Sequence, residues 1–253
     1  MTTAPTSAPV AREPQLLGQT VVVIGGSAAI GLETARLARM EGADVILTGR
    51  NAERLEQAAR DVSAPSSAAF DADDAVAVKR FFDELPPIDH VFIAAYTSGA
   101  HGPMLELPSE DVGRALGRRV TQVLEIARRA APKMRPGGTL VLTGGSVKKV
   151  DRESGITPVV FAVLPPFTAA LALELAPVRV NLIQAGYVDT ALAWSYFKDA
   201  EQVEARREEL RASLPVGRVV GPADVAALAV HLMINTAITG AAYDIDGGQR
   251  LIA

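Results

Sequence analysis

Seven short runs of apolar, largely β-branched residues recur along the chain, and longer segments with helical periodicity separate them. Strands that are buried on both faces are apolar throughout, and parallel strands need a crossover helix between them. The alternation therefore predicts one doubly wound α/β fold with a seven-stranded parallel sheet and helices on both faces. The expected strands are 20–25, 44–49, 68–72, 90–95, 139–144, 178–184 and 243–246.

The segments between these runs predict the helices. Asp73, Ser109 and the pair Pro222 and Asp224 supply start signals. Right-handed crossovers place the carboxyl ends of all strands on one edge of the sheet, where ligands bind in folds of this kind. We expect a disordered arm over 1–15 and a single Rossmann-type domain over 16–253. The expected helices are 29–41, 52–61, 73–84, 109–134, 166–176 and 223–234, with a further charged helix after 197.

Composition narrows the class of function. Apolar residues make up 49% of the chain, and 25 basic against 29 acidic residues give a formal charge of −4, which disfavours nucleic acid as a partner. The chain has no cysteine and only three scattered histidines, so we expect no disulfide and no metal site. No run approaches the roughly 20 apolar residues of a membrane span, and the first 15 residues lack the pattern of a secretory signal. We expect a cytoplasmic protein that does not bind membranes.

The stretch from Thr20 to Asn51 carries the most information about function. Strand, glycine turn, helix and second strand follow one another as in a mononucleotide-binding half. Gly25 and Gly26 allow a tight turn, Ser27 can bind phosphate, and Gly31 lets the helix pack close to the sheet with its N-terminus toward a pyrophosphate. The alternative is an ordinary tight turn.

No carboxylate ends the second strand, where one would bind the ribose hydroxyls of NAD. Arg50 stands there instead and can meet a 2′-phosphate, so the sequence favours NADP(H). A solvated charge is the alternative reading of Arg50. Asp71, after the third strand, could accept from the adenine amino group or cap the next helix.

From about Leu16 to Ala253 the sequence resembles the short-chain dehydrogenase/reductase family. The stretch "GGSAAIG" is similar to the family's glycine loop, with Ala29 for the middle glycine, and "AGYVDT" to its nicotinamide-binding segment, with Ala185 for proline. The segment from Gly217 to Gln249 is similar to its closing helix and strand. The resemblance implies NADP(H) as cofactor, bound by Gly25, Ser27, Ile30, Gly31, Arg50, Asn51, Asp71, Ala72, Ala95, Gly186, Val188 and Thr190.

The family's catalytic set of Ser, Tyr, Lys and Asn is not kept. Thr157 stands at the Tyr position, Phe161 at the Lys position and Gly145 at the Ser position, while Arg119 falls near the Asn position. A threonine hydroxyl is a poor acid, and phenylalanine carries no charge. None of the four tyrosines in the chain has a lysine four or seven residues later.

Two prolines also bear on the helix that presents the family's Tyr and Lys. Pro165 and Pro166 follow Phe161 closely, and proline inside a helix removes a hydrogen bond and disfavours helical angles before it. We therefore expect the helix to start afresh at "PPFTAALALEL". We also expect 157–163 to have lost its helical conformation.

Two hypotheses of function remain. The first is an atypical NADP(H)-dependent oxidoreductase that reduces a carbonyl or oxidises an alcohol with a relocated or water-supplied proton. Its candidate catalytic residues are Ser146, Lys148, Arg119 and Tyr96, with Tyr187 behind them; a solvated turn, a packed aromatic ring and an interface ion pair are the plainer readings. The second is an inactive dinucleotide-binding sensor or partner protein. No constellation favours a non-redox reaction.

The chain says less about substrate and assembly. Leu192, Trp194, Tyr196 and Phe197 occupy the family's variable substrate region and suggest an apolar lining for a small apolar carbonyl or alcohol, or simply the inner side of a lid. The helix 109–134 corresponds to one through which the family pairs subunits. The resemblance thus implies a homodimer or homotetramer, although the arginines of this helix (Arg114, Arg118, Arg128 and Arg129) also suit a solvated face.

Overall fold

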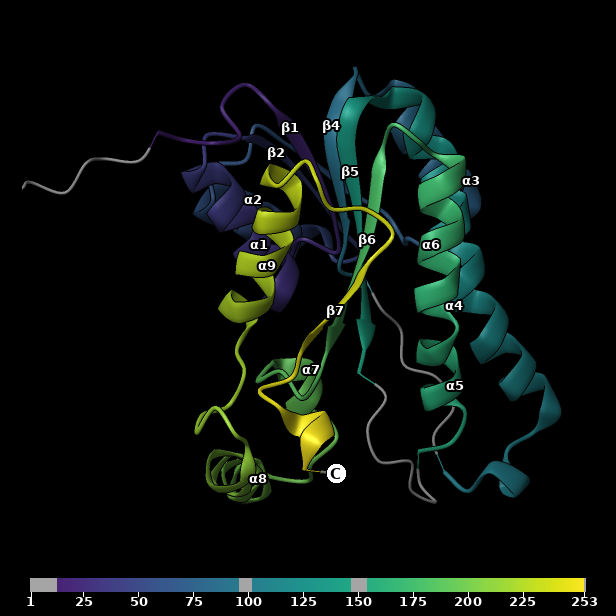
Figure 1. The fold of residues 1–253 in the computed structure, drawn as a ribbon, viewed down its shortest axis with the longest axis vertical. Helices are drawn as coiled ribbons and strands as arrows, with labels where there is room; N and C mark the ends of the chain where they lie inside the picture. The colour runs from purple at the N-terminus through teal and green to yellow at the C-terminus, as the bar shows by residue number, and fades with distance from the viewer. Residues whose placement is uncertain (1–12, 96–101, 147–153, 253) are drawn as a thin grey trace, which may run out of the picture.

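The computed structural model describes residues 13–95, 102–146 and 154–252. Its seven strands form one parallel sheet in the order β3-β2-β1-β4-β5-β6-β7 (Figure 1). This confirms the predicted α/β fold. The strands are β1 (Thr20–Ile24), β2 (Asp44–Gly49), β3 (Ser66–Ala69), β4 (Ile88–Ile93), β5 (Met134–Gly145), β6 (Arg179–Ala185) and β7 (Ala242–Ile245).

Helices cover both faces of the sheet because alternate residues of each strand point to opposite sides. Val21 and Val23 of β1 pack into one core cluster, while Val22 and Ile24 pack into the other. The first face is covered by α1 (Ala29–Met40), α2 (Ala52–Asp61) and α9 (Pro222–Ile234). The second face is covered by α3 (Ala75–Glu84), α4 (Ser109–Ala130), α5 (Thr157–Ala162) and α6 (Leu164–Glu174).

The order of the strands reverses between β1 and β4, which are hydrogen-bonded neighbours although β2 and β3 lie between them in sequence. Such a reversal leaves a crevice at the carboxyl edge of the sheet, because the connections from the two strands leave to opposite faces. The candidate site described below lies along this edge.

Several boundaries differ from the prediction. The third strand ends at Ala69 rather than at Ala72. The fifth strand begins at Met134, with an irregularity in its pairing with β4, so the preceding helix ends at Ala130 and a short turn of 3₁₀ helix (Ala131–Lys133) follows it. The predicted cap Asp73 is wrong, because the side chain of Asp74 accepts from the amides of Val76 and Ala77.

The expected loss of helix over 157–163 is also wrong. Thr157–Ala162 forms α5, and α6 follows after Val163 alone. The amide of Phe167 donates to the carbonyl of Val163 at 3.3 Å and so carries the chain across the junction. Pro165 and Pro166 lie in the first turn of α6, where a missing amide hydrogen is tolerated, so the predicted restart near the prolines is confirmed at Leu164.

Within the described ranges, one helical stretch is long and apolar enough to cross a bilayer by length and composition, and it is this pair, Thr157–Glu174. Val160, Leu164 and Leu171 of the pair are buried, and Leu164 and Leu171 belong to the core cluster on this face of the sheet. A helix of a folded core passes the same test of composition, so the finding is weak support for a membrane span.

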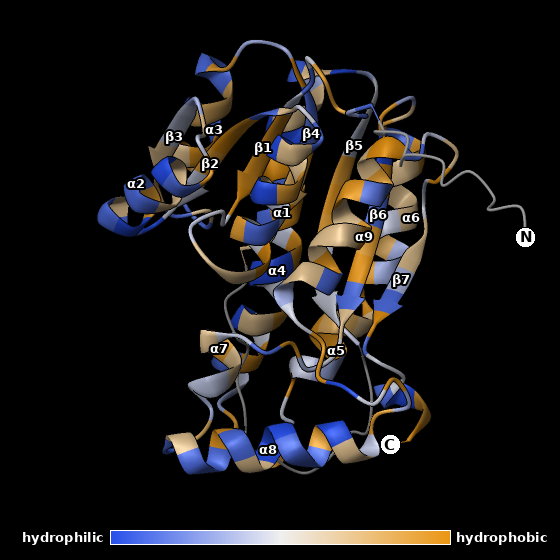
Figure 2. Cartoon of the chain, turned by 90° about the vertical axis from the view of Figure 1, so that its left-hand side faces the viewer, coloured by the Kyte–Doolittle hydropathy of each residue, from blue (hydrophilic) through white to orange (hydrophobic). Residues whose placement is uncertain are grey.

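Two further helices lie beyond the carboxyl edge of the sheet. The short α7 (Ala191–Trp194) follows β6, and α8 (Ala200–Ser213) runs across the end of the molecule as a mostly hydrophilic helix (Figure 2). Only Val203 and Leu210 of α8 are buried. The predicted charged helix after Phe197 is confirmed, and it forms one end of the site.

Candidate functional site

The glycine turn after β1 has the conformation that a phosphate loop requires. Gly25 has a φ of 89°, and a Cβ built on it would lie 2.7 Å from the backbone nitrogen of Ala95. A Cβ on Gly31 would lie 2.1 Å from the carbonyl oxygen of Gly25. The backbone therefore approaches both positions so closely that only glycine fits there. Without side chains at these two positions, the turn and the start of α1 leave room for a ligand.

The N-terminus of α1 has no side-chain cap. Ala28 stands at the N-cap position and has no side chain that can accept a hydrogen bond, so the first amides of the helix have no side-chain cap. Such amides, together with the helix dipole, attract anionic groups. Ala29 has a φ of 45° in the left-handed region, where the family resemblance expects glycine, and so carries backbone strain of about 1–2 kcal/mol.

A cavity of about 170 Å³ lies at the ends of β1 and β2, and we call it the β2 cavity. The predicted residues Gly25, Ser27 and Arg50 line it on one side. Asp71, Ala72 and Ala95 line it on the other. Its remaining lining residues are Thr48, Gly49, Phe70, Asp73, Ala94 and Gln122.

The polar residues in and beside the β2 cavity differ in whether they already have hydrogen-bond partners within the chain. The guanidinium of Arg50 makes no hydrogen bond or ion pair with any described residue, so it is open to an anionic ligand. Asn51, which was predicted to bind the cofactor, does not line the cavity; its side-chain oxygen accepts from the amide of Arg54 at 2.8 Å and caps α2. Asp71 accepts from the amide of Asp73 at 3.1 Å and does not cap α3, because Asp74 does, so the helix-cap reading of Asp71 is wrong.

A larger cavity of about 490 Å³ lies at the ends of β5 and β6, and we call it the β6 cavity. The predicted cofactor residues Ile30, Gly186, Val188 and Thr190 line it, and so does the predicted catalytic residue Ser146. Leu192, Tyr196 and Phe197 contribute an apolar wall, as the sequence predicts, whereas Trp194 lies outside it. Its other lining residues are Ala94, Thr143, Gly144, Gly145, Phe161, Ala185, Tyr187, Ala193 and Arg206.

Phe161 and Gly145, which replace the family's Lys and Ser, are in contact. A Cβ built on Gly145 would lie 2.3 Å from the Cε2 atom of the Phe161 ring and within 3 Å of two further ring carbons. The ring thus fills the space that a side chain at position 145 would need. The two departures from the family therefore depend on each other, because the Phe161 ring packs where a side chain at position 145 would lie. Together they make this wall of the β6 cavity apolar.

Three buried hydroxyl oxygens have no hydrogen-bond partner among the described residues: those of Ser146, Thr157 and Tyr187. Ser146 and Tyr187 line the β6 cavity, but Thr157 does not. The amide of Ser146 donates to the carbonyl of Ala185 at 2.8 Å, which places Ser146 beside the start of the loop that carries Tyr187. Burying an unpaired hydroxyl is unfavourable, so two such groups in one cavity point to a polar ligand.

The pKa of the Tyr187 phenol is raised, mainly by burial and then by the negative charge of Asp189. Arg206 and Arg207 act in the opposite direction. The phenol is therefore protonated at neutral pH and can donate a hydrogen bond to a ligand. A raised pKa makes it a weaker acid than an ordinary tyrosine.

Arg119 is buried but does not line the β6 cavity. Its guanidinium donates to the carbonyl of Ala95 at 2.7 Å, to the side chain of Gln122 at 2.7 Å, and to the carbonyl of Thr143. These contacts join the ends of β4 and β5 beneath the site. The observed role of Arg119 is to hold the backbone at the floor of the site.

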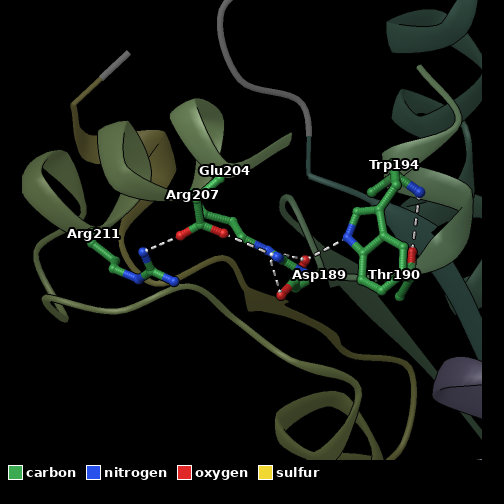
Figure 3. A network of polar contacts seen from close by, with 7 residues as sticks. Asp189, Thr190, Trp194, Glu204, Arg207 and Arg211 are labelled. Carbon is green, nitrogen blue, oxygen red and sulfur yellow. Dashed lines mark hydrogen bonds and ion pairs between the residues drawn. The ribbon is translucent and has the colours of Figure 1, made fainter. Parts of the chain in front are cut away.

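Asp189 fastens α8 to the loop after β6 (Figure 3). Its carboxylate accepts from the indole nitrogen of Trp194 at 2.6 Å and from Nε of Arg207, which lies 3.1 Å from both carboxylate oxygens. The Arg207 guanidinium also lies 5.0 Å from the centre of the Trp194 ring. Glu204 then joins Arg207 to Arg211.

Two of the predicted catalytic residues, Tyr96 and Lys148, lie outside the described residues. Of the others, the structure brings Ser146 to the β6 cavity together with Tyr187. Sequence reasoning missed Arg206, which lines the cavity, and the network around Asp189. The run "EARREEL" offers two adjacent arginines on one helix without indicating which of them faces the cavity.

The sequence is similar to known dehydrogenases and reductases along most of its length. A family model described as Enoyl-(Acyl carrier protein) reductase matches residues 25–250. The short-chain dehydrogenase/reductase ATR9 of Stachybotrys chlorohalonatus is 27% identical over 94% of this chain and 99% of its own. The 2,3-dihydro-2,3-dihydroxybenzoate dehydrogenase of Bacillus subtilis is 29% identical over 92% of this chain and 97% of its own.

Solved structures show the same likeness. A small-chain dehydrogenase crystallised in complex with NADPH has a TM-score of 0.77 and 26% identity, covering 92% of this chain and 99% of its own. A short-chain type dehydrogenase/reductase from Mycobacterium ulcerans has a TM-score of 0.83 and 25% identity, covering 94% and 91%. With a family model matching most of its length and the fold and glycine turn described above, this chain belongs to the short-chain dehydrogenase/reductase family of oxidoreductases.

Proposed function

We propose that the protein binds NADP(H) along the carboxyl edge of the sheet. The observation that carries this proposal is Arg50, whose guanidinium lines the β2 cavity without a partner among the described residues. The first amides of α1 would bind the pyrophosphate, and Arg50 the 2′-phosphate. The nicotinamide end would lie in the β6 cavity, beside Gly186 and Thr190.

The choice of NADP(H) over NAD(H) rests on charge. No carboxylate ends β2, and Arg50 can form charge-assisted hydrogen bonds with a phosphate that NADH lacks. The NADPH complex of a structurally similar dehydrogenase supports this choice. The bound cofactor would supply the hydride, and the chain's own residues would orient the substrate.

The test is titration of the purified protein with NADPH and NADH, followed by calorimetry. Arg50→Gln should weaken NADPH binding about 10–100-fold, the equivalent of the 1.5–3 kcal/mol of a hydrogen bond to a charged group, and leave NADH binding unchanged. Arg54→Gln is the matched control, because Arg54 is exposed on α2 and does not line the β2 cavity. Equal loss of both nucleotides in Arg50→Gln would contradict the assignment, and so would no loss of either.

We propose further that the bound cofactor serves carbonyl reduction or alcohol oxidation, with Ser146 and Tyr187 holding the substrate oxygen. Both hydroxyls are buried in the β6 cavity without a described partner, and they come from adjacent strand ends. Donors preorganised around an oxygen stabilise the negative charge that develops there as hydride arrives. Water or Lys148 would then supply the proton.

Turnover of NADPH with a panel of small aromatic and aliphatic aldehydes and ketones tests this arrangement. Ser146→Ala and Tyr187→Phe should each lower kcat about 10²–10³-fold, as removal of an oxyanion donor does elsewhere. Tyr243→Phe is the control, because Tyr243 lies on β7 away from the cavity. If Ser146→Ala, Tyr187→Phe, Lys148→Ala and Arg119→Ala all keep full turnover, the arrangement is wrong.

A second candidate function is a sensor or partner protein that binds the dinucleotide without redox chemistry. The contact between Phe161 and Gly145 favours it, because the ring replaces a charged group and closes the position of the family's serine. This candidate predicts NADPH binding with no oxidation across the carbonyl panel. Consumption of NADPH with any purified substrate would exclude it.

We also propose a homodimer or homotetramer that pairs through α4, by analogy with the family. The arginines of its face already have partners within the chain: Arg114 pairs with Glu110 and Asp111, Arg118 with Asp73, and Arg128 and Arg129 with Glu125. Light scattering tests this proposal, and a monomer would remove it.

A further inference from the structure

One charged side chain, Arg206, is found among the described residues that line the β6 cavity. It reaches the cavity from α8, whereas the rest of the wall is apolar or carries hydroxyls. Most arginines of a protein surface face water, whereas this guanidinium borders a largely apolar cavity. It offers a planar pair of donors to a ligand that otherwise meets hydrocarbon.

The present partners of Arg206 hold it weakly. Its Nη1 lies 2.6 Å from a carboxylate oxygen of Glu209, whose side chain is 63% exposed. Exposed ion pairs of this kind contribute only about 0–1 kcal/mol. The guanidinium also lies 5.9 Å from the centre of the Tyr187 ring, which places it beside the residue proposed to hold the substrate oxygen.

The neighbouring arginine shows what a structural role looks like on the same helix. Arg207 lies 3.1 Å from both carboxylate oxygens of Asp189, pairs with Glu204 and stacks on Trp194 (Figure 3). Arg207 does not line the β6 cavity. The two adjacent arginines therefore differ in their contacts. Arg207 fixes the position of α8, whereas Arg206 can replace its ion pair with Glu209 by an ion pair with another anion.

We propose that the β6 cavity takes an organic carboxylate with an apolar body, whose carboxylate pairs with Arg206 while its carbonyl or hydroxyl oxygen lies at Ser146 and Tyr187. This rests on the function proposed above and names its substrate class as oxo acids or hydroxy acids. Arg206 is the specificity residue in this arrangement. The apolar walls from Leu192, Phe161 and Phe197 suit a carboxylate on a hydrocarbon body better than a strongly hydrated phosphate.

The probe is 4-oxo-4-phenylbutanoate, compared with its uncharged methyl ester. Each is titrated by calorimetry into protein saturated with NADP⁺, because the oxidised cofactor gives no turnover with a ketone and binding is measured alone. The wild type should bind the oxo acid at least tenfold more tightly than the ester. Arg206→Gln should lose about 10–100-fold in affinity for the oxo acid, the fold-change expected for one charge-assisted pair, and nothing for the ester.

Arg211→Gln is the matched control. Arg211 lies on the same helix and pairs with the exposed Glu204, but it does not line the cavity, so its loss should change neither affinity. Equal amide hydrogen exchange of α8 in the two variants shows that the helix stays in place. An oxo acid that binds no better than its ester, or a loss in Arg206→Gln that is equal for both probes, overturns the inference.

The same titrations separate this inference from the proposed function. If NADP⁺ fails to bind the wild type, the proposed function and this inference fall together. If NADP⁺ binds and the oxo acid shows no preference that depends on Arg206, the cofactor assignment stands and only the substrate class is wrong.

Discussion

The region around β1, α1 and β2 and the region around β5, α5 and β6 form the two halves of the same sheet edge, yet they depart from the family to different degrees. In the first region the expected pyrophosphate contacts depend on backbone, namely a glycine with positive φ, a glycine in contact with a carbonyl and uncapped helix amides, while the side chain of Arg50 carries the proposed preference for NADP(H). In the second it depends on single side chains, and Gly145, Thr157 and Phe161 replace them. The backbone features of a phosphate loop are kept here, whereas the side chains of the family's catalytic set are replaced. A candidate cofactor site can therefore be recognised in the first region, and the family's catalytic set cannot be recognised in the second.

The largest effect should come from filling the close contact in the first region. Gly31→Val would place a Cβ 2.1 Å from the carbonyl oxygen of Gly25 and near two more backbone atoms, none of which can move aside as a side chain can. We expect a loss of at least about 3 kcal/mol in the free energy of unfolding, at the upper end for overpacking, and no measurable NADPH binding. Urea denaturation and calorimetry measure both.

The control for that prediction is Gly113→Ala. Gly113 lies on α4, and a Cβ there meets nothing within 4 Å. Replacing it should stabilise the protein by about 0.5–1 kcal/mol and leave NADPH binding unchanged. A Gly31→Val variant that binds NADPH as well as Gly113→Ala does would break the contrast between the two regions.

The second region should respond through its side chains. Gly145→Ser places a Cβ 2.3 Å from the Phe161 ring and should cost about 2–3 kcal/mol of stability. In a Phe161→Ala background the ring is gone, so the same substitution should cost about 1 kcal/mol or less. A double-mutant cycle measures the coupling between the two positions. Additive effects would mean that the two departures from the family are independent.

Acid should weaken the fold at the opposite, amino edge of the sheet. His90 of β4 is buried, with its Nε2 atom 2.6 Å from the side-chain oxygen of Gln19, and burial lowers its pKa from 6.5 to about 4. Because the unfolded chain binds the proton more tightly, stability falls as the pH drops from 6.5 toward 4. Between pH 7 and pH 5 the loss due to His90 should be about 2 kcal/mol.

Urea denaturation at the two pH values measures this loss, with His90→Gln as the comparison. The variant lacks the titrating group, so the pH dependence of its stability should be smaller by about 2 kcal/mol over the same interval, whatever its stability at pH 7. An equal dependence in both proteins would mean that His90 is not buried in its neutral form.

The smallest effect should come from a cap in the first region. Asn51 accepts from the amide of Arg54 and begins α2, so Asn51→Ala should cost about 1 kcal/mol of stability. If the side chain also contacts the cofactor, as the sequence predicts, NADPH affinity falls as well. Affinity that stays unchanged while stability falls would limit Asn51 to its role as a cap.

The sequence predicted most of the fold because glycine spacing and strand periodicity act locally. It failed where distant residues decide between equivalent local choices. In "DADDA" both Asp73 and Asp74 could cap α3; Asp74 does so, while Asp73 accepts from Gln122 at 2.8 Å and pairs with Arg118, both on α4. The helical state of 157–162 was missed because the two prolines stand in the first turn of α6, where they are tolerated.

The site was predictable where position follows from topology. Most of the predicted residues at strand ends and in the glycine turn line one of the two cavities in the structure. The contact between Gly145 and Phe161 joins residues on different elements, so the sequence shows it as two separate losses. Nor could the sequence distinguish Arg206 from Arg207, because their different surroundings depend on which of them meets Asp189 in the loop after β6.

The pairing of β5 with β6 runs over seven consecutive residue pairs from Thr139 and Arg179 to Gly145 and Ala185, and the amide of Ser146 extends it by one bond. We expect the amides of such central strands to exchange only when the whole domain unfolds, and those of the mostly exposed α8 to exchange through local opening. Ser146 would therefore be held by the slowest-exchanging part of the molecule and Arg206 by one of the fastest. A ligand that joins the two residues would slow exchange in α8 and leave that of β5 unchanged.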